Sequence, residues 1–385
     1  MSSRRFRASK ARALHSRGAR IWGPALGLLL VLPLKLVTHV PSDQKLSQGR
    51  VKRENRPNRQ SPLGFERIML RILGPFYRLV IVPLVAFLPA SLAYRVACLQ
   101  GDLRYRLDRS KREEIMRCLE SVFGDRLSLP EQTRVTRDFF RLQSCAPVDV
   151  TRLAGKGRAL TRLVEIRGRE HLEAALAAGK GAILCSAHFG SFNCAMSLIG
   201  ASGFPITVIG RWASNTVDNS RSPIGRLLSR LVFQKTIARY RRRPNIEPLG
   251  QIELAFEVAT ILRQNELIGV AIDAPLRLSG DRARGVTVDF LKGQALLLPG
   301  ATSIAQLTKA PVLMMLLHRS ADWRHQVLEI SPPISMEGDA LTAFKRCLAV
   351  VETAILQNPA HWTFWNFSDL VALGLLPEEA LNSGK

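Results

Sequence analysis

Between residues 110 and 357, short apolar runs of strand length alternate with amphipathic stretches of helical period, and this alternation constrains the fold more than any other feature. The expected strands are residues 182–187, 206–209, 268–272, 286–290, 312–317 and 326–330. The expected helices are residues 113–123, 130–143, 170–178, 192–199, 252–263, 301–308 and 340–357. This alternation predicts an α/β sandwich with a mixed, mainly parallel sheet flanked by helices.

The first 109 residues have a different character and predict two regions ahead of the α/β domain. A basic extension contains an apolar segment at 21–40, long enough to span or to anchor to a bilayer, followed by a polar linker. A second apolar stretch, at 68–99, is broken by prolines and arginines and suits membrane-associated helices lying in the interface. Whether 21–40 spans or lies in the interface stays open, as does the alternative that both stretches are core helices of a soluble protein. The expected division is an extension over 1–62, membrane-associated helices over 63–109, the α/β domain over 110–370 and a tail over 371–385.

The chain is strongly basic, with a formal net charge of +24, and half of that excess lies in residues 1–62. Such a charge suits anionic partners: nucleic acid, acidic lipid headgroups or an acidic carrier protein. Nucleic acid is disfavoured, because aromatic residues make up only 6% of the chain and no aromatic-basic platform is present. The densest basic cluster consists of Arg239, Arg241, Arg242 and Arg243. Its guanidinium groups can bind a phosphate through paired hydrogen bonds. The alternative for this cluster is a solvated run of charge.

Two polar residues stand directly after expected strands, where functional groups of α/β sheets collect. His188 follows the strand at 182–187 and enters a Gly/Ser turn, and Asp273 follows the strand at 268–272. An imidazole in such a turn is suited to take a proton from a hydroxyl. Asn193 follows five residues later and could accept a hydrogen bond from the imidazole, fixing its tautomer without supplying a negative charge. The alternatives are a core or capping histidine and a helix-start asparagine.

Competing kinds of site find less support in the sequence. Neither Ser186 nor Ser191 lies in a G-x-S-x-G motif, and no G-x-x-x-x-G-K-[ST] motif surrounds Lys180. The seven histidines show no H-E-x-x-H or comparable spacing, which disfavours a catalytic metal. Six cysteines occur without a C-x-x-C pair and mostly in apolar runs, so we expect reduced core residues.

Five segments together resemble, in order, the bacterial lipid A late acyltransferases, from about residue 63 to residue 366. The first is VEIRGREHLEAALAAGKGAILCSAHFGSFN, which is similar to the family block ending in H-x4-D/E, and ITVIGRW follows it. ELIGVAIDAP resembles the block with an Asp after its strand. The last two, GVTVDFLKGQALLLPGATSIAQLTKAPVLMM and NPAHWTFWN, resemble GxxVxFFGxPAxxxxGxAxLAxxTxAPV and NPxQWxWxH. Each segment alone is a weak signal, but five in order identify the family.

The resemblance implies a glycerol-3-phosphate acyltransferase-like sandwich at the bacterial inner membrane, with its catalytic domain on the cytoplasmic side. Its implied activity is transfer of a fatty acyl chain from acyl carrier protein or acyl-CoA to a hydroxyl of a glycolipid or lysolipid, without a metal or organic cofactor. By the same resemblance His188 is the general base, Asn193 stands where the family has the acid that orients it, and Asp273 matches a later essential Asp. The resemblance also places the family's essential Arg in the 239–243 cluster, with Arg239 or Arg241 as the best candidate. The predicted substrate-binding residues are these two together with Arg242 and Arg211.

The sequence departs from the family pattern at several places. Asn193 replaces the family acid, the segment 214–235 is longer than usual, the end reads WNFS where basic residues are expected, and residues 1–62 lie outside the pattern. Two hypotheses follow from the first departure. One is an active acyltransferase of divergent acceptor, and the other is a catalytically inactive, lipid-binding relative of the same fold.

Overall fold

A computed structural model describes residues 81–85, 88–210, 251–275 and 285–381 of the 385-residue chain. Several predicted features lie outside these ranges. They are the anchor segment at 21–40, Arg211, and the basic cluster of Arg239, Arg241, Arg242 and Arg243.

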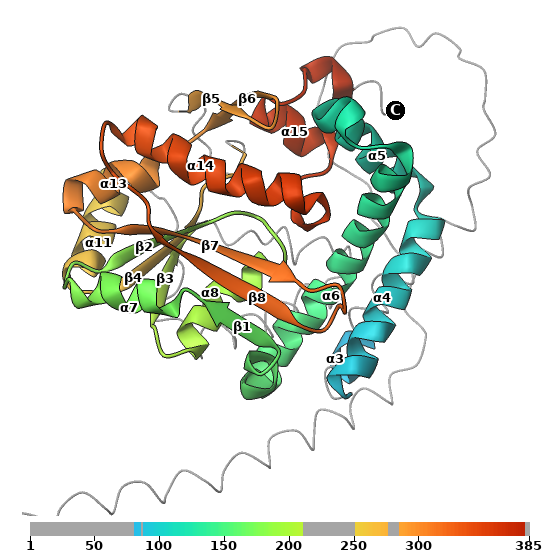
Figure 1. Cartoon of the computed structure of the whole chain (residues 1–385), viewed down its shortest axis with the longest axis horizontal. Coiled ribbons are helices and arrows are strands. Elements are labelled where there is room, and N and C mark those ends of the chain that lie inside the picture. Colours follow the sequence, from blue (N-terminus) through green and yellow to red (C-terminus); the bar gives the residue numbers. More distant parts are fainter. Residues whose placement is uncertain (1–80, 86–87, 211–250, 276–284, 382–385) are drawn as a thin grey trace, which may run out of the picture. The chain divides into compact units, whose positions relative to one another are not determined.

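The centre of the molecule is a six-stranded sheet of order β1-β8-β7-β2-β4-β3 (Figure 1). All neighbouring strands pair in parallel except β7 and β8, which are antiparallel, so the predicted mixed, mainly parallel sheet is confirmed. Its strands are β1 (Val164–Arg167), β2 (Ala182–Ser186), β3 (Ile206–Ile209), β4 (Leu267–Ala271), β7 (Val312–Arg319) and β8 (Gln326–Pro333). The strand predicted at 286–290 is also present, but it pairs with an unpredicted neighbour in a separate hairpin of β5 (Val286–Phe290) and β6 (Gly293–Leu297).

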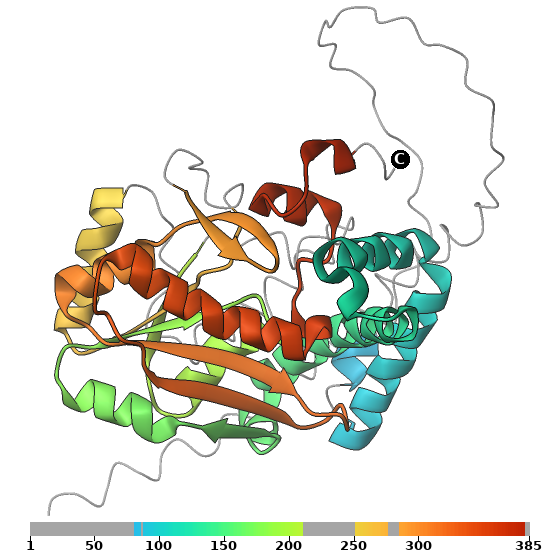
Figure 2. The same cartoon turned by 45° about the horizontal axis from the view of Figure 1, so that its top comes forward.

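Helices cover both faces of the sheet. Alternate residues of β7 separate the two cores, since Met314 and Leu316 belong to one apolar cluster and Met315 and Leu317 to the other. Figure 2 shows α14 lying across one face of the sheet and α7 across the other. The helices of the sandwich are α7 (Arg169–Ala177), α8 (Phe192–Ala201), α11 (Gln251–Arg263), α13 (Gly300–Thr308), α14 (Ala340–Gln357) and α15 (Phe367–Leu373). All six cysteines are free and five of them are buried, as the sequence predicts.

A helical unit precedes the sheet and packs at one end of it. It consists of α3 (Val82–Val85), α4 (Ala90–Leu107), α5 (Arg109–Phe123) and α6 (Leu129–Thr161). A small apolar cluster that includes Ala93, Ala97 and Val148 holds α4 against α6. The helix expected to end at residue 143 instead continues through Pro147 to Thr161. None of the helices in the described part of the chain is both long enough and apolar enough to cross a bilayer.

Candidate active site

Two adjacent parallel strands deliver the two polar residues that the sequence singles out. In the pairing of β2 with β4, Ser186 stands opposite Ala271. The pairing extends one step further, because the backbone N–H of Ile272 donates to the carbonyl of Ser186 at 2.9 Å. His188 and Asp273 each lie two residues beyond the matched strand ends, so the sheet register brings them to the same place.

The imidazole of His188 contacts the carboxylate of Asp273 directly. Nδ1 of His188 lies 2.8 Å from Oδ1 of Asp273, and the backbone N–H of His188 donates to both carboxylate oxygens at 3.0 and 2.9 Å. Asp273 is fully buried, whereas the His188 side chain retains 15% of its exposure. A carboxylate at Nδ1 favours the tautomer that carries its proton there, which leaves Nε2 as a proton acceptor. The pair therefore has the arrangement of a general base and its orienting acid.

The segment that follows α14 in the chain contacts both His188 and Asp273. The indole N–H of Trp362 donates to Oδ2 of Asp273 at 2.9 Å, and Trp362 is fully buried. The same segment bonds to residues 188–191, which we call the His188 turn. The backbone N–H of Thr363 donates to the carbonyl of His188 at 3.0 Å, and the N–H of Gly190 donates to the carbonyl of His361 at 2.7 Å. Residues 361–363, which overlap the WTFW motif (residues 362–365), thus bond to both Asp273 and the turn that carries His188.

Aromatic rings flank the imidazole on two sides. The ring centroids of Phe192 and Phe364 lie 4.4 and 4.6 Å from that of His188. Phe192 comes from the start of α8 and Phe364 from the carboxyl-terminal segment. These rings limit the freedom of the imidazole and give its surroundings an apolar character.

The predicted site residues are only partly brought together. His188 and Asp273 are in contact, and Asp273 is the residue that lies at Nδ1 of the imidazole. Asn193 lies in the first turn of α8, and its side chain is outside the described part of the structure. A role for Asn193 and for the four arginines therefore stays a prediction. Sequence reasoning missed Trp362, although it lies in a segment that carries the family resemblance.

His361 gives the site a predicted sensitivity to acid. Its Nε2 accepts the backbone N–H of Arg319 at 3.1 Å. Burial, together with the nearby His318 and Arg319, lowers the pKa of His361 from 6.5 to about 3. The unfolded chain takes up a proton near pH 6.5 and the folded chain does not, so the stabilising contribution is complete above that pH and is lost as pH falls toward 3.

We expect His361→Gln to reduce this loss, because a glutamine oxygen can accept the same N–H and does not titrate. Between about pH 6.5 and about pH 4.5 the free energy of unfolding should fall by about 2 to 3 kcal/mol less in the variant than in the wild type. Chemical unfolding of both chains at the two pH values measures the difference. Equal losses would show that His361 is not the acid-sensitive group.

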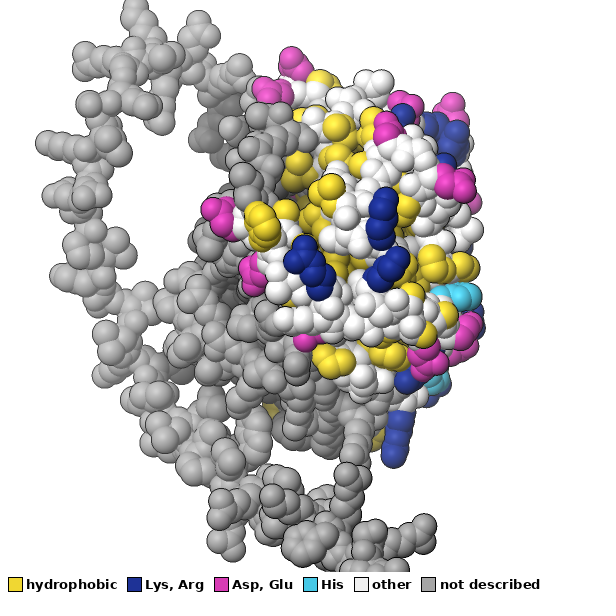
Figure 3. Space-filling view, turned by 90° about the vertical axis from the view of Figure 1, so that its left-hand side faces the viewer, with side chains coloured by type: hydrophobic (Ala, Val, Ile, Leu, Met, Phe, Trp, Pro, Cys, Tyr) yellow, Lys and Arg dark blue, Asp and Glu magenta, His cyan; other side chains and the backbone are white. Residues whose placement is uncertain are grey.

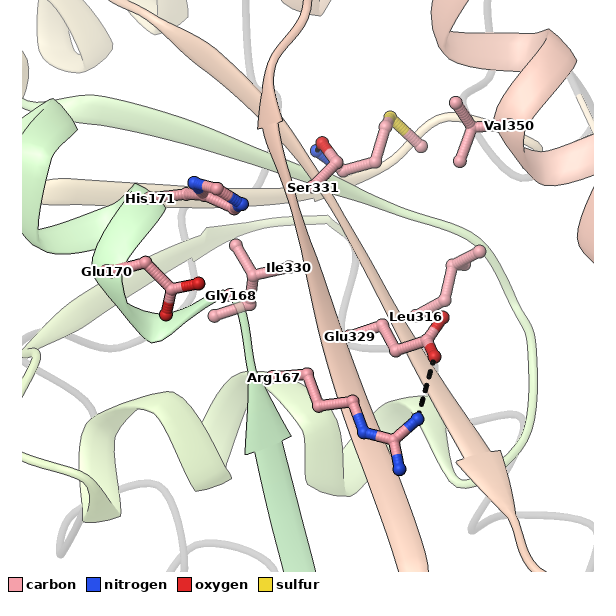
Figure 4. A pocket seen from close by; sticks show the side chains of 10 residues that line it. Arg167, Gly168, Glu170, His171, Leu316, Glu329, Ile330, Ser331 and Val350 are labelled. Atoms are coloured by element: carbon pink, nitrogen blue, oxygen red, sulfur yellow. Dashed lines mark hydrogen bonds and ion pairs between the residues drawn. The ribbon is translucent and has the colours of Figure 1, made fainter.

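Two other surface features of the molecule lie apart from His188 and Asp273. Figure 3 shows the side that carries α11 and α13, where hydrophobic and basic side chains are interspersed. Elsewhere in the sequence, three exposed basic residues stand shortly before β2, β4 and β7, at the opposite ends of these strands from His188 and Asp273: Lys180, Arg263 and Lys309. A surface cavity of about 320 Å³ lies beside β1 and β8, where Arg167 pairs with Glu329 at 3.7 Å (Figure 4). Neither His188 nor Asp273 lines that cavity.

Comparison with known proteins identifies the family to which the chain belongs. The family model described as bacterial lipid A biosynthesis acyltransferase matches residues 65–366, which include both strands that deliver the pair and the WTFW motif. No curated protein sequence matches the chain. The matched region covers well over half of the chain, and it agrees with the five segments whose order suggests the same family. The protein belongs to the bacterial lipid A biosynthesis acyltransferase family.

Proposed function

We propose that this protein transfers a fatty acyl chain from a thioester donor, acyl carrier protein or acyl-CoA, to a hydroxyl of a glycolipid or lysolipid. Family membership implies acyltransferase activity in lipid A-type biosynthesis. The single observation that carries the proposal further is the contact between Nδ1 of His188 and the buried carboxylate of Asp273. This contact supports a general base at the carboxyl-terminal ends of β2 and β4.

The proposed reaction follows from the orientation of the imidazole. Nε2 of His188 takes the proton of the acceptor hydroxyl while that oxygen bonds to the carbonyl carbon of the thioester. The tetrahedral intermediate then collapses, the C–S bond breaks, and the proton on Nε2 passes to the departing sulfur. The products are an ester and a free thiol. Throughout, the Asp273 carboxylate stabilises the imidazolium.

The charge on Asp273 bears on the choice between an active enzyme and an inactive relative. Asn193 carries a neutral amide, which cannot supply the negative charge that stabilises a developing imidazolium. Asp273 can supply it, at 2.8 Å and with its geometry fixed by the Trp362 indole. The arrangement favours an active enzyme over an inactive relative.

Attachment to the inner membrane, with the catalytic domain on its cytoplasmic side, is part of the proposal. The outer face of α3 and α4 supports it, because four leucines there keep between 44% and 67% of their exposure: Leu84, Leu92, Leu99 and Leu103. Arg95 and Arg106 are exposed on α4 as well. A mixed apolar and basic face suits the interface of an anionic bilayer. We further propose that the cluster of Arg239, Arg241, Arg242 and Arg243 binds an anionic donor or acceptor group.

Intact-lipid mass spectrometry of cells that lack the gene, complemented with the wild type or with His188→Ala, tests the function. One lipid class should lose a single acyl chain in the deletion, and only the wild type should restore it. Both proteins should be found in the membrane fraction at equal levels, so that abundance does not explain the difference. A deletion that leaves every lipid class unchanged would contradict the transferase proposal and favour the lipid-binding alternative.

A further inference from the structure

A second buried carboxylate lies beside the His188 turn. Asp149, on α6, is completely buried and accepts hydrogen bonds from four side chains on four other parts of the fold. The phenol of Tyr94 on α4 donates at 2.6 Å and the amide of Gln326 on β8 at 3.2 Å. Arg319 at the end of β7 and the hydroxyl of Ser191 donate to the other oxygen. Asp149 thus joins the helical unit, the sheet and the His188 turn.

Two of the side chains that donate to Asp149, those of Arg319 and Tyr94, have raised pKa values. The Arg319 side chain is only 2% exposed, and its guanidinium also donates to the carbonyl of Trp323 at 2.7 Å. Burial alone would lower the pKa of Arg319, but the adjacent carboxylate of Asp149 raises it overall, so the guanidinium stays charged. Burial and Asp149 together raise the pKa of Tyr94, so the phenol can only donate. A buried ion pair is weak evidence for stability, because desolvation offsets much of its attraction. Its arrangement therefore suggests another role.

The link to the base runs through Ser191. Ser191 is the N-cap residue of α8, a position where a serine hydroxyl usually accepts a hydrogen bond from the helix. Here the side chain makes no such capping bond and donates to Asp149 instead. Ser191 is three residues from His188 and ends the His188 turn. The Ser191 side chain therefore lacks the stabilising hydrogen bond of a helix cap, and its hydroxyl instead attaches the His188 turn to α6.

We propose that the Asp149–Arg319 pair, acting through the Ser191 hydroxyl, positions the His188 turn for catalysis. The inference rests on the proposed function, since positioning matters only if His188 is the base. Asp149, Arg319 and Ser191 are positioning residues and do not touch the substrate. In Figure 1 the connection between β7 and β8 lies beside α6 and α4, the helices that carry Asp149 and Tyr94.

Two hydroxyl deletions form a matched test. Ser191→Ala and Tyr94→Phe each remove one hydroxyl that donates to Asp149, but only the first belongs to the His188 turn. Ser191→Ala should lower kcat about ten- to hundredfold with little change in KM, because a small displacement of the base is costly. Tyr94→Phe should leave kcat within about twofold, although it removes a hydrogen bond of the same kind. Equal effects of the two variants on kcat would overturn the proposal.

A spectroscopic measurement separates this proposal from the proposed function. In chains with isotope-labelled histidine and no substrate, the Nδ1 proton that His188 shares with Asp273 should give a resonance that Ser191→Ala shifts and Tyr94→Phe leaves in place. An unchanged resonance in Ser191→Ala would overturn the positioning role whatever the activity. A shifted resonance in a chain whose wild type transfers no acyl group would instead overturn the proposed function and leave the structural link standing.

Discussion

Replacing His188 with alanine is expected to lower the kcat of acyl transfer at least about 10³-fold, because the acceptor hydroxyl then loses its base. Asp273→Asn should lower kcat by about 10³- to 10⁴-fold, as a comparable change does in a serine protease. The reason is visible in the contacts of Asp273, which accepts from the His188 backbone, His188 Nδ1 and Trp362 Nε1. An amide presents one acceptor oxygen and an NH₂ group, and the NH₂ group favours the tautomer that places the imidazole proton on Nε2.

The double variant supplies the decisive comparison. If the two residues act as one unit, His188→Ala combined with Asp273→Asn should be no slower than His188→Ala alone. His325→Ala is the matched control, because His325 also pairs with a carboxylate, Asp322, at 2.6 Å, but half of its side chain is exposed. The control should keep kcat within about twofold. Additive losses from the two site variants would contradict a shared role.

Gly190→Ala is expected to lower the free energy of unfolding by more than about 4 kcal/mol or to prevent accumulation of folded protein. Gly190 has φ of +61° in the His188 turn, a conformation that L side chains rarely adopt. In addition, a Cβ at this position would lie 2.0 Å from the carbonyl oxygen of Leu317 on β7. Backbone cannot yield as a flexible side chain can, so either the turn or the strand must move.

Gly179→Ala separates the two contributions. Gly179 also has positive φ, +72°, but a Cβ there meets nothing within 4 Å. This control should therefore cost only the conformational term, about 1 to 2 kcal/mol. Chemical unfolding of both variants measures the difference. An equal and small loss in Gly190→Ala would show that the turn adjusts freely and is not closely held against β7.

Much of the fold could be predicted because its core elements are strongly patterned. The bounds predicted for 206–209, 286–290 and 340–357 agree with the structure. β1 was missed because its sequence, VEIR, alternates apolar with exposed charged residues over only four positions at the edge of the sheet. α6 was ended too early because residues 144–161 contain Pro147 and glycines, which disfavour helices locally. Packing against α4 and the contacts of Asp149 outweigh that preference.

The sequence singles out His188 and Asp273 separately, but it does not indicate that they are in contact. His188 and Asp273 follow strands, and the ends of parallel strands are where polar side chains signal function. Asn193, five residues from His188, was the natural partner to consider from sequence, whereas Asp273 is 85 residues away. Their contact depends on β2 and β4 being neighbours in matched register, which no local pattern reveals. The hydrogen bond from Trp362 to Asp273 likewise joins residues far apart in the sequence, so no local pattern indicates it.

The most direct test of the central claim is to follow both products of one reaction. The full-length chain, reconstituted in vesicles, is given an acyl thioester donor and a lipid extract from cells that lack the gene. Free thiol and newly acylated lipid are then measured together. The account predicts that thiol and ester form in a one-to-one ratio with the wild type and that neither forms with His188→Ala. Ester formation at the wild-type rate in His188→Ala would contradict it.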